Sequence, residues 1–303
     1  MLKFILPTFL LISCSGIKPI NNKKASDESL VQTKAPIISK NTKLVSSIKT
    51  IELQPGKVKF VEFDIALEDG MKTLNCRGTK TDFLVEKKKG RFLMAESYFS
   101  SMKPYECLYK DTIILSVKVK QFPYKSEKLN VDKKRVTLSK KDLARVIKER
   151  EILKKIYKNS ASYYLFDKPF IRPLNSFITS HYGNRRVFNN KKKSQHLGND
   201  LRAAVGLPIP VANKGKVVFT GHLFYSGNIV IVDHGLNLYS LYGHLSKIKV
   251  AQGMIINQGE IVGLAGATGR VSGPHLHWGI KLNSQNIDGF SLVDESKKMF
   301  GND

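Results

Sequence analysis

Two kinds of residue are scarce in this sequence of 303 residues: it has three cysteines, and 25 acidic residues stand against 50 lysines and arginines. Neither Cys76 nor Cys107 has a histidine in its local sequence, so neither is a candidate nucleophile. The formal net charge of +25 favours anionic partners. Nucleic acid is not expected among them, because no helix-turn-helix, zinc-finger or aromatic RNA-binding signature accompanies the charge.

The N-terminus lacks an apolar run long enough to span a membrane, but it does carry a short export signal. Lys3 gives the positive start, and residues 4–12 form the apolar stretch. The tetrad Leu11-Ile12-Ser13-Cys14 resembles a bacterial lipobox, in which the signal is removed and the cysteine is lipidated. We expect an exported lipoprotein, anchored through Cys14 at the periplasmic face of a bacterial envelope. An ordinary signal peptide that ends in a cysteine is the alternative.

Export would affect whether the remaining cysteines can form a disulfide and which anionic partners the basic residues can meet. Outside the cytoplasm Cys76 and Cys107 can form a disulfide, and two buried thiols are the alternative. Lysine-rich clusters at 87–89, 133–135 and 191–193 would there meet cell-wall polymers or lipid headgroups.

The N-terminal half predicts a small β domain. Leu115, Val117 and Val119 alternate with polar neighbours, which places them on one face of a strand. Turn signals such as Pro55-Gly56 separate this run from similar ones, so a small β-sandwich is the expected architecture. The residues before this half are rich in Ser, Lys and Asn without periodicity, which is typical of a flexible tether.

One helix is predicted between the two halves. Ser139, followed three residues later by Asp142, resembles a capping box, and Leu143, Ile147 and Leu153 then recur at helical spacing. We expect this helix to pack on a neighbouring domain, with a partner helix as the alternative.

Beyond residue 165, short strands follow one another without intervening helices, which predicts an antiparallel sheet and a mainly β protein. The glycines in residues 263–273 do not open a helix after a strand, so they indicate turns and not a dinucleotide site. The predicted segments are a signal peptide (1–13), a tether (14–45), a β-rich domain (46–138), a connecting helix (139–164), a C-terminal β domain (165–290) and a tail (291–303).

Two segments predict a metal site. In His275-Leu276-His277 the alternation along a strand places both histidines on one face and the leucine on the other. His196 and Asp200 stand four residues apart, where Gly198 and Asn199 favour a loop that leads into a strand. Zinc takes imidazole and carboxylate ligands, and a catalytic zinc keeps one position open.

Four segments agree in order and distance with one known family: Thr179 to Arg185, His196 to Asp200, Tyr242 to Ser246 and Thr268 to Gly279. They resemble the lysostaphin/LytM-type zinc metallopeptidases of bacterial cell walls, over about residues 170–285. The resemblance implies a groove on an antiparallel sheet, which holds one Zn²⁺ and in which a peptide cross-link of peptidoglycan is cut. It implies His196, Asp200 and His277 as metal ligands, and His244 and His275 as the catalytic histidines.

The chemistry agrees with those roles. Two neutral imidazoles and one carboxylate leave zinc with a net positive charge, which lowers the pKa of bound water toward about 7. An imidazole pKa of about 6.5 suits a general base, and His275 is our choice. His244 then either hydrogen-bonds the water or, when protonated, stabilises the tetrahedral intermediate.

The other candidates have less specific interpretations. His181, His222 and His234 are expected to be packed or surface side chains, although the segment around His234 is a candidate for shaping the groove. Arg185 and Arg186 are either a clamp for a substrate carboxylate or a solvated pair.

The predicted function is an exported zinc endopeptidase that cuts peptidoglycan cross-links. A non-catalytic wall-binding or amidase-activating protein of the same fold is the alternative, and a wall carboxypeptidase is a third reading. The bond that is cut, D-alanine to diaminopimelate or a glycine bridge, stays open. We expect the N-terminal half to restrain activity, and a regulatory partner is unknown.

Overall fold

The structure is a computed structural model that describes residues 44–129, 138–188 and 192–301. The predicted signal peptide (1–13), the predicted lipidation site Cys14 and all but the end of the expected tether lie outside these ranges. In the described part of the chain, 21 strands and two helices confirm the mainly β prediction. Neither of these two helices has the length and apolar character needed to cross a membrane.

The N-terminal strands form one sheet, in the order β1-β7-β6-β3-β4-β5-β2. All neighbours in it are antiparallel except β1 and β7. The sheet curls until its edge strands β1 and β2 touch, so one continuous sheet encloses the core that a two-sheet sandwich was expected to hold. The bounds are β1 Lys49–Leu53, β2 Val58–Asp64, β3 Gly70–Cys76, β4 Thr79–Glu86, β5 Lys89–Ala95, β6 Tyr105–Tyr109 and β7 Thr112–Val119.

Aromatic side chains fill the core of this sheet, and a disulfide links two of its neighbouring strands. Phe83 and Phe92 are fully buried, and Phe63 contacts both of their rings. Cys76 on β3 and Cys107 on β6 are register partners and form a disulfide, which answers the question left open by the sequence. Leu115, Val117 and Val119 point into the same core, as their alternation predicts.

Helix α2 (Lys140–Ile156) is the predicted connecting helix, capped as expected by the Ser139 hydroxyl, which accepts from the amide of Asp142 at 3.1 Å. It is shorter than the range 139–164, because Ser160 and Ala161 bond the carboxylate of Asp233 instead of continuing the helix.

The face on which α2 packs differs from the predicted stripe. Leu153, with Tyr157 just beyond the helix, packs on an apolar cluster of the C-terminal sheet. Leu143 and Ile147 are exposed instead. Val146, which lies between them, is the buried residue of the helix.

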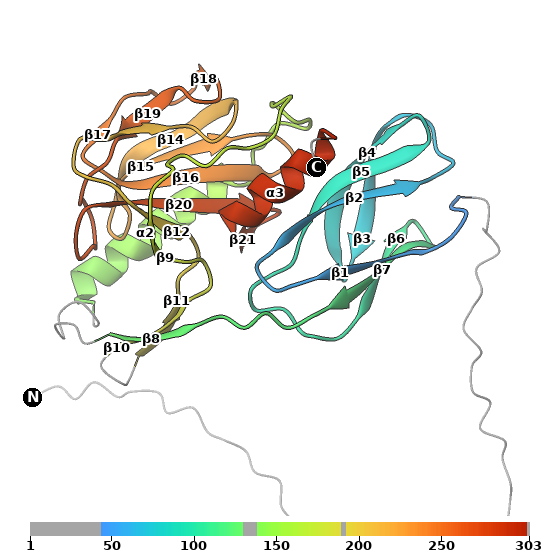
Figure 1. The fold of residues 1–303 in the computed structure, drawn as a ribbon, viewed down its shortest axis with the longest axis horizontal. Helices are drawn as coiled ribbons and strands as arrows, with labels where there is room; N and C mark the ends of the chain where they lie inside the picture. The colour runs from blue at the N-terminus through green and yellow to red at the C-terminus, as the bar shows by residue number, and fades with distance from the viewer. Residues whose placement is uncertain (1–43, 130–137, 189–191, 302–303) are drawn as a thin grey trace, which may run out of the picture. The chain divides into compact units, whose positions relative to one another are not determined.

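The C-terminal strands form an antiparallel eight-stranded sheet in the order β18-β14-β15-β16-β20-β12-β9, with β21 paired to β20 (Figure 1). Two three-stranded sheets accompany it, β13-β19-β17 and β11-β10-β8. In the second, β8 pairs in parallel with β10. The bounds are β8 Ser126–Leu129, β9 Ile178–Ser180, β10 Arg185–Phe188, β11 Lys192–Gln195, β12 Asn199–Arg202, β13 Pro208–Pro210, β14 Gly215–Leu223, β15 Gly227–Asp233, β16 Leu238–Leu245, β17 Lys247–Ile248, β18 Ile255–Ile256, β19 Ile261–Leu264, β20 His275–Leu282 and β21 Gln285–Ile287.

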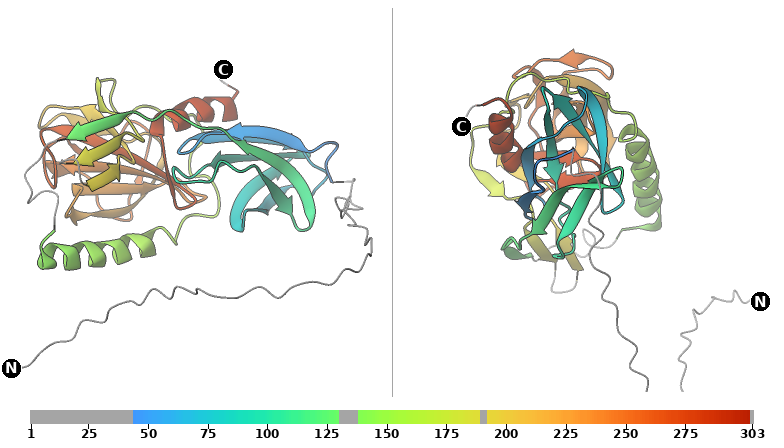
Figure 2. Two further views of the ribbon diagram at one scale, coloured as in Figure 1. Left: turned by 90° about the horizontal axis from the view of Figure 1, so that it is seen from below. Right: turned by 90° about the vertical axis from the view of Figure 1, so that its right-hand side faces the viewer.

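The two faces of the eight-stranded sheet have different roles. Alternation on β20 turns Leu276 and Trp278 into the main core, where both are fully buried. The opposite face carries His275, His277 and, farther along the strand, Lys281. The ammonium of Lys281 lies 5.1 Å from the ring of Tyr157, so α2 and the histidines share one face of the sheet. Figure 2 shows α2 along that face.

Residues 291–303, which the sequence predicts as a tail, instead belong largely to helix α3 (Gly289–Met299). Leu292, Val293 and Ser296 are buried, and Asp288 caps the helix by accepting from the amide of Phe290. The helix lies against β2 (Figure 1), where Glu295 accepts from the amide of Phe60 at 2.8 Å. The segment is therefore a packed helix, and the prediction of a tail is wrong for residues 291–299.

Candidate metal centre

Three donor atoms from separate segments meet at one point. Strands β12 and β20 pair so that Asp200 lies opposite His277, and His196 comes from the loop just before β12. Asp200 Oδ1 is 2.8 Å from His277 Nδ1 and 2.9 Å from His196 Nε2, and the two nitrogens are 3.2 Å apart. This is the group of described residues that can hold a metal ion, and it contains all three predicted ligands.

The donor set suits zinc. Tetrahedral zinc with ligands at about 2.0–2.1 Å separates its ligand atoms by about 3.3 Å, close to the distances above. His196 Nδ1 lies 3.0 Å from the carbonyl of His181 and 3.2 Å from the Ser180 hydroxyl, so a proton on Nδ1 leaves the Nε2 lone pair for a metal. Burial lowers the pKa of His196, which favours the neutral, ligating form.

The charge of Asp200 also suits a metal ligand. Burial alone raises the pKa of this carboxyl, but the adjacent imidazoles of His196 and His277 outweigh it and hold the pKa well below the usual range. Close packing fixes the arrangement at Gly198, where an added Cβ would fall 2.4 Å from Cε1 of His277. A larger residue there would displace the ring.

His244 and His275 lie beside the three donors, as predicted. Their ring centroids are 4.8 Å apart, and Nε2 of His275 is 3.6 Å from Asp200 Oδ1. Each histidine donates Nδ1–H to a backbone carbonyl, His244 to Thr268 at 2.8 Å and His275 to Gly273 at 2.9 Å. Both Nε2 atoms are thereby left as proton acceptors.

The backbone at His244 is strained. Its φ of +62° lies in the left-handed region, which costs about 1–3 kcal/mol for a residue other than glycine. The His244 amide donates to the carbonyl of Ser226 at 2.7 Å, which helps to hold this conformation. Burial, and then the charge of His277, lower the pKa of the His244 side chain to about 4.

Arg186 is a site residue whose role the sequence does not predict. Its Nη2 lies 3.2 Å from Asp200 Oδ2 and 2.8 Å from the Ser180 hydroxyl. One guanidinium thus holds the far oxygen of one donor and the hydroxyl that contacts His196. Arg186 therefore contacts a candidate metal ligand and is partly buried, whereas its neighbour Arg185 is exposed.

The side chains of the remaining histidines are not among the three donors, although the carbonyl of His181 accepts from His196 Nδ1. His181 and His222 have exposed side chains. His234 is fully buried, with Nδ1 2.8 Å from the carbonyl of Lys214 and Nε2 2.7 Å from the Ser240 hydroxyl. Packed or surface positions were expected for all three residues.

Residues 194–289 match the family described as peptidase family M23. The peptidoglycan DD-endopeptidase ShyA of Vibrio cholerae serotype O1 is 37% identical over 112 residues, which are 37% of this chain and 26% of that protein. The DD-carboxypeptidase/endopeptidase Mpg of Neisseria meningitidis serogroup B is 37% identical over 98 residues, 32% of this chain and 23% of that protein. The matches thus cover about a quarter of the length of these curated relatives.

A crystal structure from Pseudomonas aeruginosa, described as a peptidase M23, has a similar fold. It superimposes with a TM-score of 0.62 at 24% identity, and covers 80% of this chain and 95% of that chain. The shared part is larger than the C-terminal sheet alone, so it includes much of the N-terminal β domain. At this identity the likeness shows the fold.

Proposed function

Because residues 194–289 form a domain of peptidase family M23, we propose that the chain is a zinc-dependent endopeptidase that hydrolyses peptide cross-links of bacterial peptidoglycan. The observation that carries the proposal is the convergence of His196, Asp200 and His277 next to two histidines with available Nε2 atoms. This complete set argues against the non-catalytic alternative.

In this mechanism His196, Asp200 and His277 hold the zinc. When bound, zinc supplies Lewis acidity that makes water more acidic and polarises a carbonyl. His275 takes a proton at Nε2 and returns it to the leaving amine, and the Gly273 carbonyl keeps its ring oriented. A pKa of about 4 keeps His244 neutral at pH 7, which favours hydrogen-bond acceptance at its Nε2 over a protonated, charge-stabilising role.

The substrate and location are part of the same proposal. Relatives named DD-endopeptidase favour a D-alanine to diaminopimelate bond over a glycine bridge. An excess of basic residues, with a net charge of +25, suits an anionic wall polymer. Export as a lipoprotein, with Cys14 as the lipidated residue, would place the enzyme beside that polymer.

The test uses the zinc-loaded full chain and purified sacculi. The wild type should release muropeptides, whose cleaved bond is identified by mass spectrometry. His275→Ala should keep zinc and lose at least about a hundredfold in rate, since general bases contribute about 10²–10⁴-fold. His196→Ala should lose both zinc and activity. A wild type that binds zinc and releases nothing from sacculi would favour the non-catalytic alternative.

A further inference from the structure

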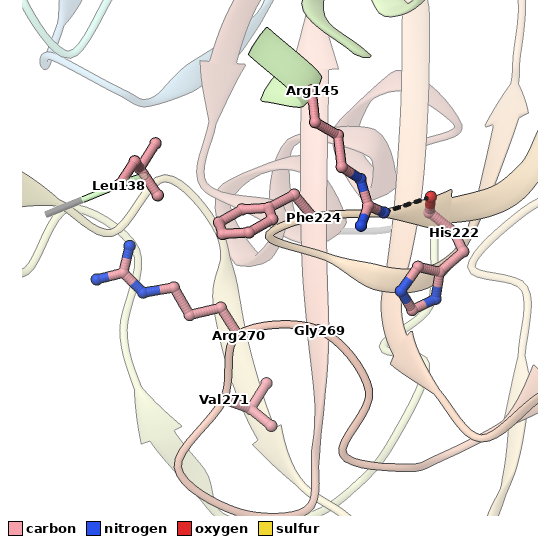
Figure 3. Close-up of a pocket in the computed structure, with 7 residues that line it drawn as sticks. All are labelled: Leu138, Arg145, His222, Phe224, Gly269, Arg270 and Val271. Carbon is pink, nitrogen blue, oxygen red and sulfur yellow. Dashed lines mark hydrogen bonds between the residues drawn. The ribbon is translucent and has the colours of Figure 1, made fainter. Parts of the chain in front are cut away.

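A cavity of about 430 Å³ lies between helix α2 and the loop that precedes β20 (Figure 3). Among the described residues its lining combines two arginines, a histidine and apolar side chains, and includes no carboxylate. The lining residues are Leu138, Arg145, His222, Phe224, Gly269, Arg270 and Val271.

One wall of this cavity is the loop that also orients a candidate catalytic histidine. Thr268 accepts the Nδ1–H of His244 on its carbonyl, and its hydroxyl accepts from the amide of Asn228 at 2.9 Å. Two residues later, the amide of Arg270 donates to the carbonyl of Tyr225 at 3.0 Å. Consecutive Cα atoms are about 3.8 Å apart, so Arg270 Cα lies within about 8 Å of Thr268 Cα. The cavity is therefore one loop away from the reaction centre.

The opposite wall comes from α2, outside the M23 domain at 194–289. Arg145 bonds the carboxylate of Glu149 at 2.7 Å and the carbonyl of His222 at 3.2 Å. Both oxygens of Glu149 accept from the amide of Phe224, at 3.0 and 2.9 Å. These bonds fix Phe224 in place and neutralise the charge of Arg145.

Arg270 is the cation of the lining that is left for a ligand. No carboxylate of the described residues forms an ion pair with it, and its guanidinium lies 5.6 Å from the ring centre of Tyr225. Figure 3 shows the guanidinium groups of Arg145 and Arg270 on opposite sides of the Phe224 ring. A single guanidinium beside an aromatic ring matches one carboxylate on a partly apolar peptide.

We propose that this cavity is a subsite for a free carboxylate of the peptidoglycan stem peptide, with Arg270 as its counter-charge and Phe224 as its apolar floor. This subsite rests on the proposed function, because the stem must also present its scissile bond at the metal centre. The cavity would then select stems by the charge at one end.

The test compares two cross-linked muropeptides that differ only in having free stem carboxylates or the matching carboxamides. With the zinc-loaded full chain, Arg270→Gln should raise KM about tenfold for the carboxylate substrate and leave KM for the carboxamide within about twofold. Arg270→Lys should recover part of the loss. Arg150→Gln, an exposed arginine of α2 outside the cavity, removes the same charge and should change neither KM.

Three outcomes would overturn the subsite. An equal increase in KM for both substrates in Arg270→Gln would show that Arg270 stabilises the loop and does not bind the carboxylate. Equal KM values for both substrates in the wild type would show that the enzyme does not recognise the free carboxylate. The proposed endopeptidase activity would still stand. Inhibition by inorganic phosphate at lower concentration than by a free stem peptide would point to a phosphate site. If the wild type cuts neither substrate, the proposed function fails instead, and calorimetric binding of a free stem peptide to wild type and Arg270→Gln still decides the subsite.

Discussion

At the scale of single residues, Arg186 links two parts of the metal centre. It bonds the oxygen of Asp200 that faces away from the donor cluster, and the hydroxyl beside His196. Removing such an outer partner typically costs about 10- to 100-fold in metal affinity. We expect Arg186→Gln to weaken zinc binding by at least about tenfold in a chelator competition at pH 7.

The neighbouring residue provides the control for that experiment. Arg185→Gln removes the same charge from an exposed side chain and should leave zinc affinity unchanged. Equal affinities for the two variants would show that Arg186 does not position Asp200.

His234 gives a residue-scale prediction for pH. Burial lowers its pKa to about 4, from about 6.5 in the unfolded chain. The unfolded state therefore binds a proton first, and stability that is present above about pH 6.5 is lost as the pH falls toward 4. The free energy of unfolding that is lost in this way amounts to about 3 kcal/mol. In urea unfolding curves at pH 7 and pH 4.5, His234→Gln should lose less stability between the two pH values than the wild type.

An exposed histidine serves as the matched control for this effect. His222→Gln makes the same substitution at an exposed position and so controls for the change of residue type. A His234→Gln variant with an unchanged pH slope would contradict the assignment.

Alternation along one strand predicts that His275 and His277 share a face, whereas the set of donors, His196, Asp200 and His277, came from the family resemblance. Arg186 was not predictable, since its role depends on β10 lying beside the segment of Asp200 and on one side-chain conformation. No residue type or spacing signals such a contact.

At the scale of elements, the Cys76–Cys107 disulfide joins β3 to β6 across a sequence separation of 31 residues. Closing a loop of that length stabilises the folded state by about 3–4 kcal/mol. The double variant Cys76→Ala/Cys107→Ala should lose about that amount in denaturant unfolding, monitored in the N-terminal sheet. Zinc affinity should not change, and a parallel loss of zinc would mean that the two β domains unfold together.

The two helices show where sequence patterns stop being sufficient. The capping residues of α2 fixed its start, but its end depends on Asp233, a residue of β15 that captures Ser160. Helix α3 follows Asp288-Gly289, a pair that usually indicates a turn, and its Leu292 and Val293 are buried in the main core while Glu295 accepts from the Phe60 amide of β2. Both results depend on distant partners.

At the scale of the whole molecule, the N-terminal half contributes to the core of the C-terminal half. Val58 and Leu93 belong to the same buried cluster as Phe166 and Trp278. A chain that starts at Asp167 would lose these contacts, α2, and the pairing of β8 with β10. We expect its melting temperature to be at least about 10 °C lower than that of the full chain, since several kcal/mol of burial are removed.

This affects how the restraint of activity by the N-terminal half can be tested. A truncated chain with low activity would be explained by instability alone, so a full chain with weakened contacts is the better probe. Glu295→Gln, which weakens the bond to the Phe60 amide, should raise the cleavage rate if the half restrains the site. A rate at or below that of the wild type would contradict the restraint.

The carboxylate of Asp288 bonds groups from three separate segments of the chain. Besides capping α3, its carboxylate receives the ammonium of Lys57 at 2.6 Å and the side-chain amide of Asn199 at 3.0 Å, one residue before Asp200. The two β domains are consequently not interchangeable modules. A chimera that carries a foreign N-terminal domain would have to supply its own cation at the place of Lys57, or leave a buried negative charge uncompensated next to the metal ligand.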